Sequence, residues 1–322
     1  MVSSSIPFYE TKKMTKLSAF FVIGLLAVFN LSAVAAPWNS STAEHKQSLL
    51  QNGIKRNYLV RLPPKLPNHG RLVPLVLVLH GGGGNAANAE RMSGFTDKAA
   101  RENFIVVYPE GSSRLKGKLQ TWNAGHCCGY AMEKGINDVA FINALLDRLI
   151  KDYPVDPKRI YATGMSNGGM MTHKLGIELS SRFAAIAPLV ATLFGDEIKP
   201  EHAVSAMFIN GMLDKPVPYQ GSALGGRFPN AWDGSPTKPA IEQAIFWANA
   251  NNCSAIPDKL EQGAVIQWQY HCPANKDVAL YLIKDSGHAW PGGQKGSSRG
   301  DEPSLSLNAT DLIWTFFKSH TK

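Results

Sequence analysis

The sequence of 322 residues contains no internal repeat and no block of five to eight residues rich in lysine and arginine. The missing repeat excludes solenoids and propellers, and the missing basic block argues against nucleic-acid binding. Glycine and proline, at 29 and 20 residues or about 15% of the chain, are close to ordinary usage and too few for a collagen-like or low-complexity protein. A mean hydropathy of −0.14 excludes a polytopic membrane protein.

The composition that remains is that of a globular protein, with 44% hydrophobic and 18% charged residues. A chain of this length can bury a sizeable core in one large domain or two small ones. The formal net charge is +8, but the lysines and arginines are scattered along the sequence. We therefore expect a mildly basic, solvated surface.

The N-terminus has the three parts of a secretory signal peptide. A basic flank with Lys12, Lys13 and Lys16 comes first. The fifteen uncharged residues 17–31 follow, and then the run of small residues 32–36. Fifteen residues are fewer than the about 20 that span a bilayer, so an uncleaved anchor is the weaker alternative. We expect cleavage after Ala35, which removes residues 1–35, or residues 14–35 if translation starts at Met14. The mature chain would carry a charge of +6, be secreted or periplasmic, and keep no stable membrane association.

Export to an oxidising compartment favours disulfides among the four cysteines. Cys253 and Cys272 flank a short polar stretch and are the expected pair. Cys127 and Cys128 are adjacent, which leaves either a bridge between neighbours or two free thiols. A zinc site has little support, because no second Cys-x-x-Cys or His-x-x-x-His accompanies them.

Short apolar runs alternate with amphipathic stretches, a pattern typical of an α/β fold with a mostly parallel sheet and helices on both faces. The expected strands are 75–79, 104–108, 159–163, 184–190, 206–209 and 278–283, and the expected helices are 87–102, 138–151, 167–180, 238–251 and 310–319. Residues 54–62 suggest a hairpin or edge strand. No linker follows residue 50, so we expect 36–322 to form a single domain, with 216–237 as an excursion over the site.

The strongest chemical signal is the pentapeptide Gly-Met-Ser-Asn-Gly at 164–168, between an expected strand and an expected helix. Glycines two residues before and after Ser166 allow a sharp, strained turn that exposes the serine hydroxyl. The helix that follows adds partial positive charge where an oxyanion would form. The pentapeptide alone is common by chance, and its position between strand and helix makes Ser166 a candidate nucleophile.

A serine nucleophile needs a histidine and an acid. His288 follows the expected strand 278–283, and Asp214 follows the expected strand 206–209. Separately, Asp214 could cap a turn and His288 could be an ordinary loop histidine. Together with Ser166 they stand in the chain order serine, acid, histidine that is typical of serine hydrolysis on this fold class, so we expect a catalytic triad.

The sequence His-Gly-Gly-Gly-Gly-Asn at 80–85 predicts the oxyanion hole, because glycines leave backbone N–H groups unobstructed. We expect the N–H groups of Gly82 and Asn167 to be the donors, with Gly81 or Gly83 as alternatives to Gly82. A phosphate-binding loop is the rival interpretation, but neither Gly-Lys-Ser/Thr nor a dinucleotide pattern is present. His80 is expected to be structural, bonding the neighbouring backbone.

Seven segments together resemble the secreted polyhydroxybutyrate depolymerase and feruloyl esterase group of α/β-hydrolases. They are His-Gly-Gly-Gly at 80–83, Tyr-Pro-Glu-Gly at 108–111, Trp-Asn-Ala-Gly-His-Cys-Cys-Gly at 122–129, Asp-Val-Ala-Phe at 138–141, the segment 159–170 around Ser166, Asp-Lys-Pro-Val-Pro-Tyr at 214–219 and Gly-His-Ala-Trp-Pro at 287–291. The resemblance covers about residues 54–318. It implies a serine carboxylesterase without metal or cofactor, with Ser166 as nucleophile, His288 as general base and acid, and Asp214 as orienting acid.

Two departures from the family pattern bear on the substrate. Asn210 stands before Gly211 where many relatives have histidine, and this difference need not touch catalysis. Many polymer depolymerases carry a linker and a substrate-binding module after the catalytic domain, whereas this sequence ends about 34 residues after His288. We therefore expect soluble esters or oligomers to be better substrates than crystalline polymer.

Several further residues have both a functional and a structural interpretation. Trp122, Tyr219 and Trp290 are expected to line the acyl site, with Trp232 as a further candidate, although each could be plain packing. Asp138 opens an expected helix, where a carboxylate stabilises the first turn.

Polyhydroxyalkanoate-type esters or oligomers are the expected substrates. The alternatives are a feruloyl or acetyl-xylan esterase, a serine peptidase, and a non-catalytic binding protein, which would have lost part of the triad. Neither the natural ester nor the oligomeric state follows from the sequence.

Overall fold

The computed structural model describes residues 44–66, 70–115, 117–223 and 231–322, which belong to one compact unit. The predicted signal peptide and its cleavage site lie outside the described residues. Among the helices of the described part of the chain, none has the length and apolar character needed to cross a membrane. The predicted single α/β domain is confirmed over this range.

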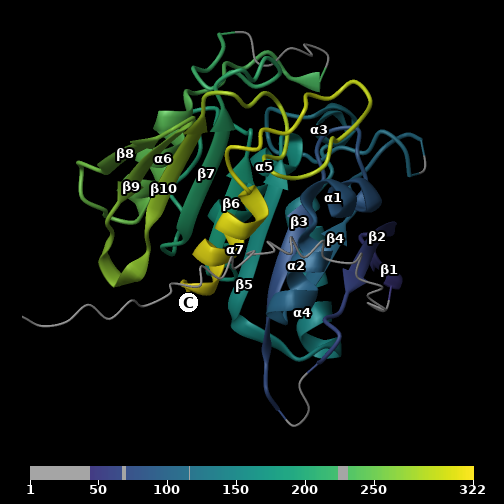
Figure 1. The fold of residues 1–322 in the computed structure, drawn as a ribbon. Coiled ribbons are helices and arrows are strands. Elements are labelled where there is room, and N and C mark those ends of the chain that lie inside the picture. Colours follow the sequence, from purple (N-terminus) through teal and green to yellow (C-terminus); the bar gives the residue numbers. More distant parts are fainter. Residues whose placement is uncertain (1–43, 67–69, 116, 224–230) are drawn as a thin grey trace, which may run out of the picture. The chain divides into compact units, whose positions relative to one another are not determined.

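A sheet of ten strands runs through the unit in the order β1-β2-β4-β3-β5-β6-β7-β10-β9-β8 (Figure 1). The central strands from β4 to β10 are parallel, and two antiparallel strands lie at each edge. The strands are β1 (Glu44–Gln51), β2 (Ile54–Arg61), β3 (Val73–Leu79), β4 (Ile105–Pro109), β5 (Val155–Met165), β6 (Ala185–Leu189), β7 (Ser205–Gly211), β8 (Asp258–Gln262), β9 (Val265–Tyr270) and β10 (Val278–Ile283).

Helices cover both faces of this sheet, as the sequence predicts. They are α1 (Ala86–Ser93), α2 (Phe95–Glu102), α3 (Gly129–Glu133), α4 (Asp138–Asp152), α5 (Asn167–Glu178), α6 (Ala240–Ala250) and α7 (Ala309–Lys318). Side chains of β3 alternate between two buried clusters, Leu77 in one and Val78 in the other. The Leu77 cluster takes in α4, α5 and α6, and the Val78 cluster takes in α1, α2 and α7. Each helix layer thus packs on its own face.

Some elements differ from the expectation. The single helix predicted over 87–102 is two helices, because Gly94 adopts φ 65° and ends α1 with its N–H on the Glu90 carbonyl. Residues 54–62 do form a hairpin strand, β2, which pairs with an unpredicted β1. Strands β8 and β9 were also not predicted, since every residue of β8 is exposed and no buried face alternates with a polar one.

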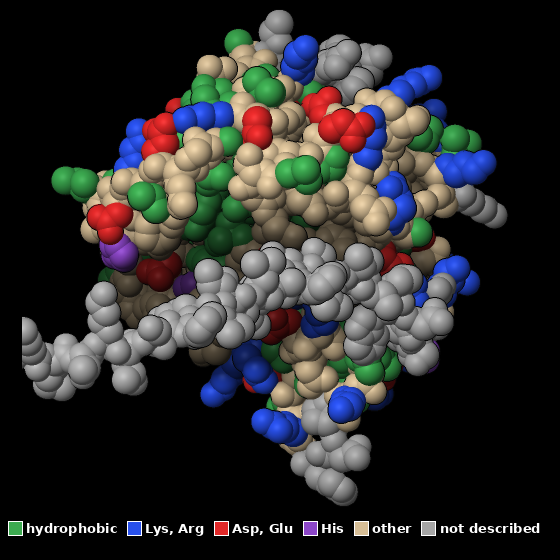
Figure 2. All heavy atoms as spheres, in the orientation of Figure 1, with side chains coloured by type: hydrophobic (Ala, Val, Ile, Leu, Met, Phe, Trp, Pro, Cys, Tyr) green, Lys and Arg blue, Asp and Glu red, His purple; other side chains and the backbone are tan. Residues whose placement is uncertain are grey.

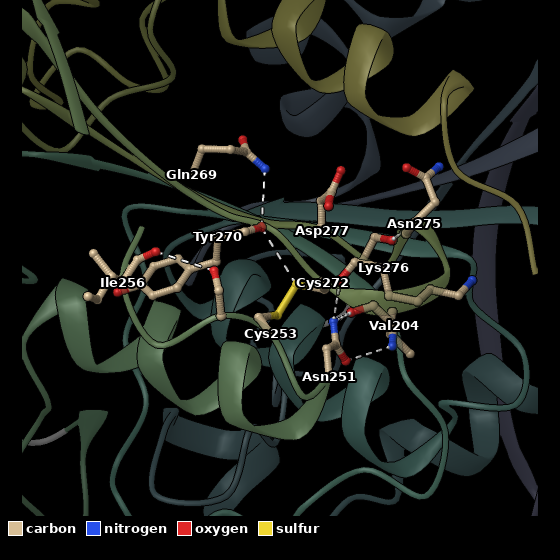
Figure 3. The surroundings of a disulfide bond; sticks show 12 residues. Val204, Asn251, Cys253, Ile256, Gln269, Tyr270, Cys272, Asn275, Lys276 and Asp277 are labelled. Atoms are coloured by element: carbon tan, nitrogen blue, oxygen red, sulfur yellow. Dashed lines mark hydrogen bonds between the residues drawn. A yellow bond between two sulfur atoms is a disulfide. The ribbon is translucent and has the colours of Figure 1, made fainter. Parts of the chain in front are cut away.

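The predicted disulfide between Cys253 and Cys272 is present and ties the segment after α6 to the end of β9 (Figure 3). Beside it, the Asn251 amide donates to the carbonyl oxygens of Val204 and Lys276, at 2.8 and 2.9 Å. These contacts fix the outer hairpin of β8 and β9 to the body of the sheet.

The visible surface mixes charges of both signs. Figure 2 shows lysine and arginine side chains interspersed with aspartate and glutamate on the described part of this face. This distribution agrees with the scattered cations of the sequence.

Candidate active site

Ser166 lies in the turn between β5 and α5, with φ 57° and ψ −124°. The turn requires glycine on both sides, because a Cβ at Gly164 would lie 2.6 Å from the Gly168 carbonyl oxygen. A Cβ at Gly168 would lie 2.6 Å from the carbonyl oxygen of Leu79. The pentapeptide therefore forms the strained strand-to-helix turn that the sequence predicts, with Ser166 only partly buried.

Asp214 and His288 come from the loops after β7 and β10 and form a hydrogen-bonded pair. The distance from His288 Nδ1 to Asp214 Oδ2 is 2.8 Å, and the Asp214 side chain is 1% exposed. The other carboxylate oxygen accepts the Val217 N–H at 2.8 Å. A carboxylate at Nδ1 selects the tautomer with the proton on that nitrogen, which leaves Nε2 as the acceptor.

One cavity of about 1180 Å³ joins these residues at the carboxyl ends of the parallel strands. Ser166, Asp214 and His288 all line it, together with Gly82 and Asn167. No hydrogen bond links the Ser166 hydroxyl to His288 among the described residues. Such bonds are often long in ligand-free enzymes and tighten when substrate binds.

The structure favours Gly82 over its neighbours as the glycine donor. The Gly83 N–H already donates to the Gln120 carbonyl oxygen at 2.8 Å, and Gly81 does not line the cavity. Gly82 does line it, and a Cβ placed there would be 3.6 Å from the Asn167 Cβ. Asn167 is the first residue of α5, where a backbone N–H has no partner within the helix.

The Asn167 side chain fixes the neighbouring Trp122 segment. Its Oδ1 accepts the Trp122 N–H at 2.7 Å, and its Nδ2 donates to the Trp122 carbonyl oxygen at 3.0 Å. The amide thus engages both polar groups of one residue's backbone. This pairing holds the segment that carries Cys127 and Cys128 beside the turn at Ser166.

His80 is structural, as expected. It is fully buried, its Nε2 accepts the Gly111 N–H at 3.0 Å, and its Nδ1 donates to the Gly81 carbonyl oxygen at 2.8 Å. Burial lowers the pKa of His80 to about 4. The ring is therefore neutral and connects the glycine loop to the end of β4.

Asp138 is the first residue of α4, as expected, and also forms a buried ion pair. Its carboxylate lies 2.6 Å from Arg56 Nη2 and accepts the Asn123 N–H at 2.8 Å. Burial raises the pKa of Asp138, and Arg56 opposes this only in part. Asp138 is 1% exposed and does not line the cavity. Asp138 thus positions the chain next to Trp122.

The tryptophan and tyrosine residues expected at the acyl site do not line the cavity. Trp122 is fully buried and donates from Nε1 to the His80 carbonyl oxygen at 3.0 Å. Trp290 is fully buried, packs against Phe95 and donates from Nε1 to the Thr310 hydroxyl at 2.9 Å. Tyr219 is half-buried against the core. Trp232, the further candidate, does line the cavity.

Other lining residues were not singled out as site residues from the sequence. Leu119 and Leu213 expose apolar side chains at the cavity, and Lys215, Arg299 and Asp301 add charges there. Asp301 accepts the His288 N–H at 2.7 Å and so helps to hold that residue. All these residues come from irregular loops, where no periodic pattern reveals which side chains converge.

The adjacent cysteines form a disulfide, which resolves the alternative between a bridge and free thiols. Cys128 lines the cavity, and Cys127 Sγ lies 3.9 Å from Asn167 Nδ2. No cluster of three or more His, Cys, Asp or Glu side chains suited to a metal ion occurs within the part of the chain that the structure describes.

Comparisons with known proteins find relatives whose names describe esterases. "Feruloyl esterase B" from Piromyces equi is 29% identical over 248 residues, which cover 75% of this chain and 44% of that protein. "Putative esterase NocK" from Nocardia uniformis subsp. tsuyamanensis is 29% identical over 255 residues, which cover 75% of this chain and 72% of that protein. The match thus spans less than half of the Piromyces protein.

A solved structure, "Acetyl xylan esterase from Aspergillus awamori", has a TM-score of 0.59 and 16% identity, covering 85% of this chain and 99% of that one. This likeness shows the α/β-hydrolase fold. A family model described as esterase PHB depolymerase matches residues 56–232, more than half of the sequence. The chain therefore belongs to the esterase PHB depolymerase family.

Proposed function

We propose that this protein is a serine carboxylesterase, with Ser166 as nucleophile, His288 as general base and acid, and Asp214 as orienting acid. The observation that carries the proposal is the buried Asp214–His288 pair at 2.8 Å in the same cavity as Ser166. The family to which the chain belongs supports ester hydrolysis.

The mechanism is a two-step acyl transfer. His288 Nε2 takes the Ser166 proton as Oγ attacks the ester carbonyl, and the Gly82 and Asn167 N–H groups stabilise the oxyanion. The imidazolium then gives its proton to the leaving alcohol, and an acyl-enzyme remains. Water, deprotonated by the same imidazole, attacks this ester and releases the acid and the serine. Asp214 keeps the imidazole oriented through its hydrogen bond with Nδ1.

The proposed substrates are polyhydroxyalkanoate-type esters or their oligomers. A cavity of about 1180 Å³ with Leu119, Leu213 and Trp232 in its walls offers room and apolar surface for several atoms on either side of the ester. Feruloyl or acetyl esters of plant polysaccharides are the second candidate, favoured by the name of the Piromyces relative. In both cases residues 1–35 would direct export, so that the enzyme meets its substrate outside the cell.

The triad is tested with Ser166→Ala and p-nitrophenyl butyrate. We expect kcat to fall by about four to six orders of magnitude without loss of thermal stability, because the hydroxyl is the attacking group. Ser181→Ala, at an exposed serine after α5, is the matched control and should keep full activity. Retention of more than a few per cent of activity in Ser166→Ala would overturn the assignment.

The substrate is tested by product release from amorphous polyhydroxybutyrate and from feruloylated arabinoxylan. Release of 3-hydroxybutyrate or its oligomers alone supports the polyester assignment. Release of ferulate alone replaces it with the plant cell-wall assignment, while the serine chemistry stands.

A further inference from the structure

A second cluster of polar side chains lies around His126, outside the triad. His126 Nδ1 is 2.6 Å from Asp233 Oδ2, and His126 Nε2 is 2.8 Å from Asp196 Oδ2. The Ser235 hydroxyl lies 2.9 Å from the same Nδ1. The cluster therefore joins three loops, those of 124–128, 192–198 and 231–235.

The cluster is built for a charged imidazole. A neutral ring has one N–H, so one of its two nitrogens would present a lone pair to a carboxylate oxygen. Only the imidazolium donates to both Asp196 and Asp233. Partial burial lowers the pKa of His126, but hydrogen bonds and charge from the two carboxylates outweigh it, and the net pKa is raised.

The other groups that face the ring are few. Phe194 packs on it with ring centroids 4.9 Å apart. Glu197 is engaged by the backbone N–H groups of Phe194 and Gly195. Lys174 and Glu178 of α5 line the same small pocket and pair with each other. The two aspartates are thus the charges bonded to His126.

The cluster is joined directly to the wall of the catalytic cavity. The Asp233 N–H donates to the His126 carbonyl oxygen at 3.1 Å, and Cys127 and Trp232 form a β-bridge. Trp232 also packs edge-on against Phe194, with centroids 5.9 Å apart. Trp232 lines the catalytic cavity, whereas Asp233 and Phe194 contact His126. Movement of His126 and its partners would therefore move this wall.

We propose that His126 is a positioning residue for the catalytic cavity. Its imidazolium, shared between Asp196 and Asp233, holds Trp232 as the wall on which the substrate packs, and deprotonation releases that wall. This inference rests on the proposed esterase function for its kinetic consequence. Because the folded state binds the proton more tightly, the clamp is closed at acidic pH and opens as the pH rises through the raised pKa of His126.

The kinetic test measures kcat and KM for p-nitrophenyl butyrate between about pH 5.5 and pH 9. In the wild type, KM should rise about fivefold as His126 loses its proton, while kcat follows a separate profile. His126→Gln should show the raised KM at every pH, and His126→Arg should keep the low KM throughout. The matched control is His271→Gln, which removes an exposed imidazole 2.8 Å from Asp258 on the β8–β9 hairpin.

A second measurement does not depend on catalysis. Acrylamide quenches tryptophan fluorescence. The contribution of Trp232 to this quenching is the difference between a given protein and the same protein with Trp232→Phe. This contribution should grow with pH in the wild type and be large at all pH values in His126→Gln and in Asp196→Asn. Asp196→Asn keeps the Asp233 contact, so it provides a milder variant if His126→Gln folds poorly.

The two proposals can fail separately. If the wild type shows no Ser166-dependent ester turnover, the esterase assignment is overturned, and the quenching data still decide the role of His126. If KM and quenching in His126→Gln follow those of the wild type, or if His271→Gln changes them equally, His126 does not position the wall.

Discussion

Two histidines, His80 and His173, are fully buried and neutral. His173 Nε2 donates to Gln243 Oε1 at 2.7 Å, and Nδ1 accepts the Trp247 N–H at 3.1 Å. In each ring the nitrogen without a proton faces an N–H donor, so a second proton has no place to bind. Burial lowers the pKa of both rings to about 4.

These two residues predict loss of stability in acid. The unfolded chain takes up protons near pH 6.5 and the folded chain only near pH 4, so the free energy of unfolding falls as the pH drops across this window. Each buried histidine should cost about 3 kcal/mol by pH 4. Urea denaturation at several pH values measures the loss, which should be smaller in His173→Gln. An unchanged pH slope in that variant, or an equal change in the exposed-residue control His202→Gln, would contradict the prediction.

At the same scale, the sequence predicted the positions of Ser166, Asp214 and His288 because each signal is local. A glycine pair marks the sharp turn, and the ends of buried strands mark the loops at one edge of the sheet. The orientation of Trp290 could not be predicted, although it stands two residues from His288. Which side of a loop a side chain faces depends on packing partners such as Phe95, which is remote in sequence.

At the scale of elements, the buried strands were the most predictable, since their continuous apolar runs have no other place in a globular protein. The residues of β10 agree with the expected range in full. The outer hairpin of β8 and β9 was missed because every residue of β8 is exposed and all of β9 except Tyr270 is only half-buried. It is held by pairing with β10 and by the Cys253–Cys272 disulfide rather than by a core of its own.

From this attachment we predict how much the disulfide contributes to the free energy of unfolding. Cys253→Ser with Cys272→Ser opens a loop with a sequence separation of 19 and should lower the free energy of unfolding by about 3 kcal/mol. Esterase activity at low temperature should stay near that of the wild type, because no residue of 253–275 lines the cavity. Chemical denaturation and kcat/KM are measured together. Lost activity without lost stability would show that the hairpin has a role at the site.

At the scale of the whole molecule, one sheet edge gathers residues that are far apart in the sequence. The parallel direction of β3, β5, β7 and β10 brings their carboxyl ends together, and with them Gly82, Ser166, Asp214 and His288. Fold class and chain order made this convergence predictable. The loops that complete the cavity, such as 297–302, have no periodicity from which their path could be predicted.

The molecule as a whole is predicted to be exported. The protein recovered outside the producing cell should begin at Ala36, because Ala33 and Ala35 provide the small residues that signal peptidase needs. Intact mass and N-terminal sequencing measure the cleavage position. Ala33→Lys should block processing and leave the longer form attached to the cell, while Ser40→Ala, beyond the cleavage site, should be processed normally. An exported protein that retains residues before Ala36 would contradict the predicted site.

The Asn167 amide both donates to and accepts from the Trp122 backbone. This double contact limits where directed evolution can change the substrate range. Few side chains offer a donor and an acceptor in this geometry, so position 167 should tolerate almost no variation. The loops at 213–217 and 231–235 make no such paired contact with the serine turn. Libraries that vary those loops but keep Asp214, Trp232 and Asp233 should yield new acyl preferences, whereas libraries at 167 should yield inactive protein.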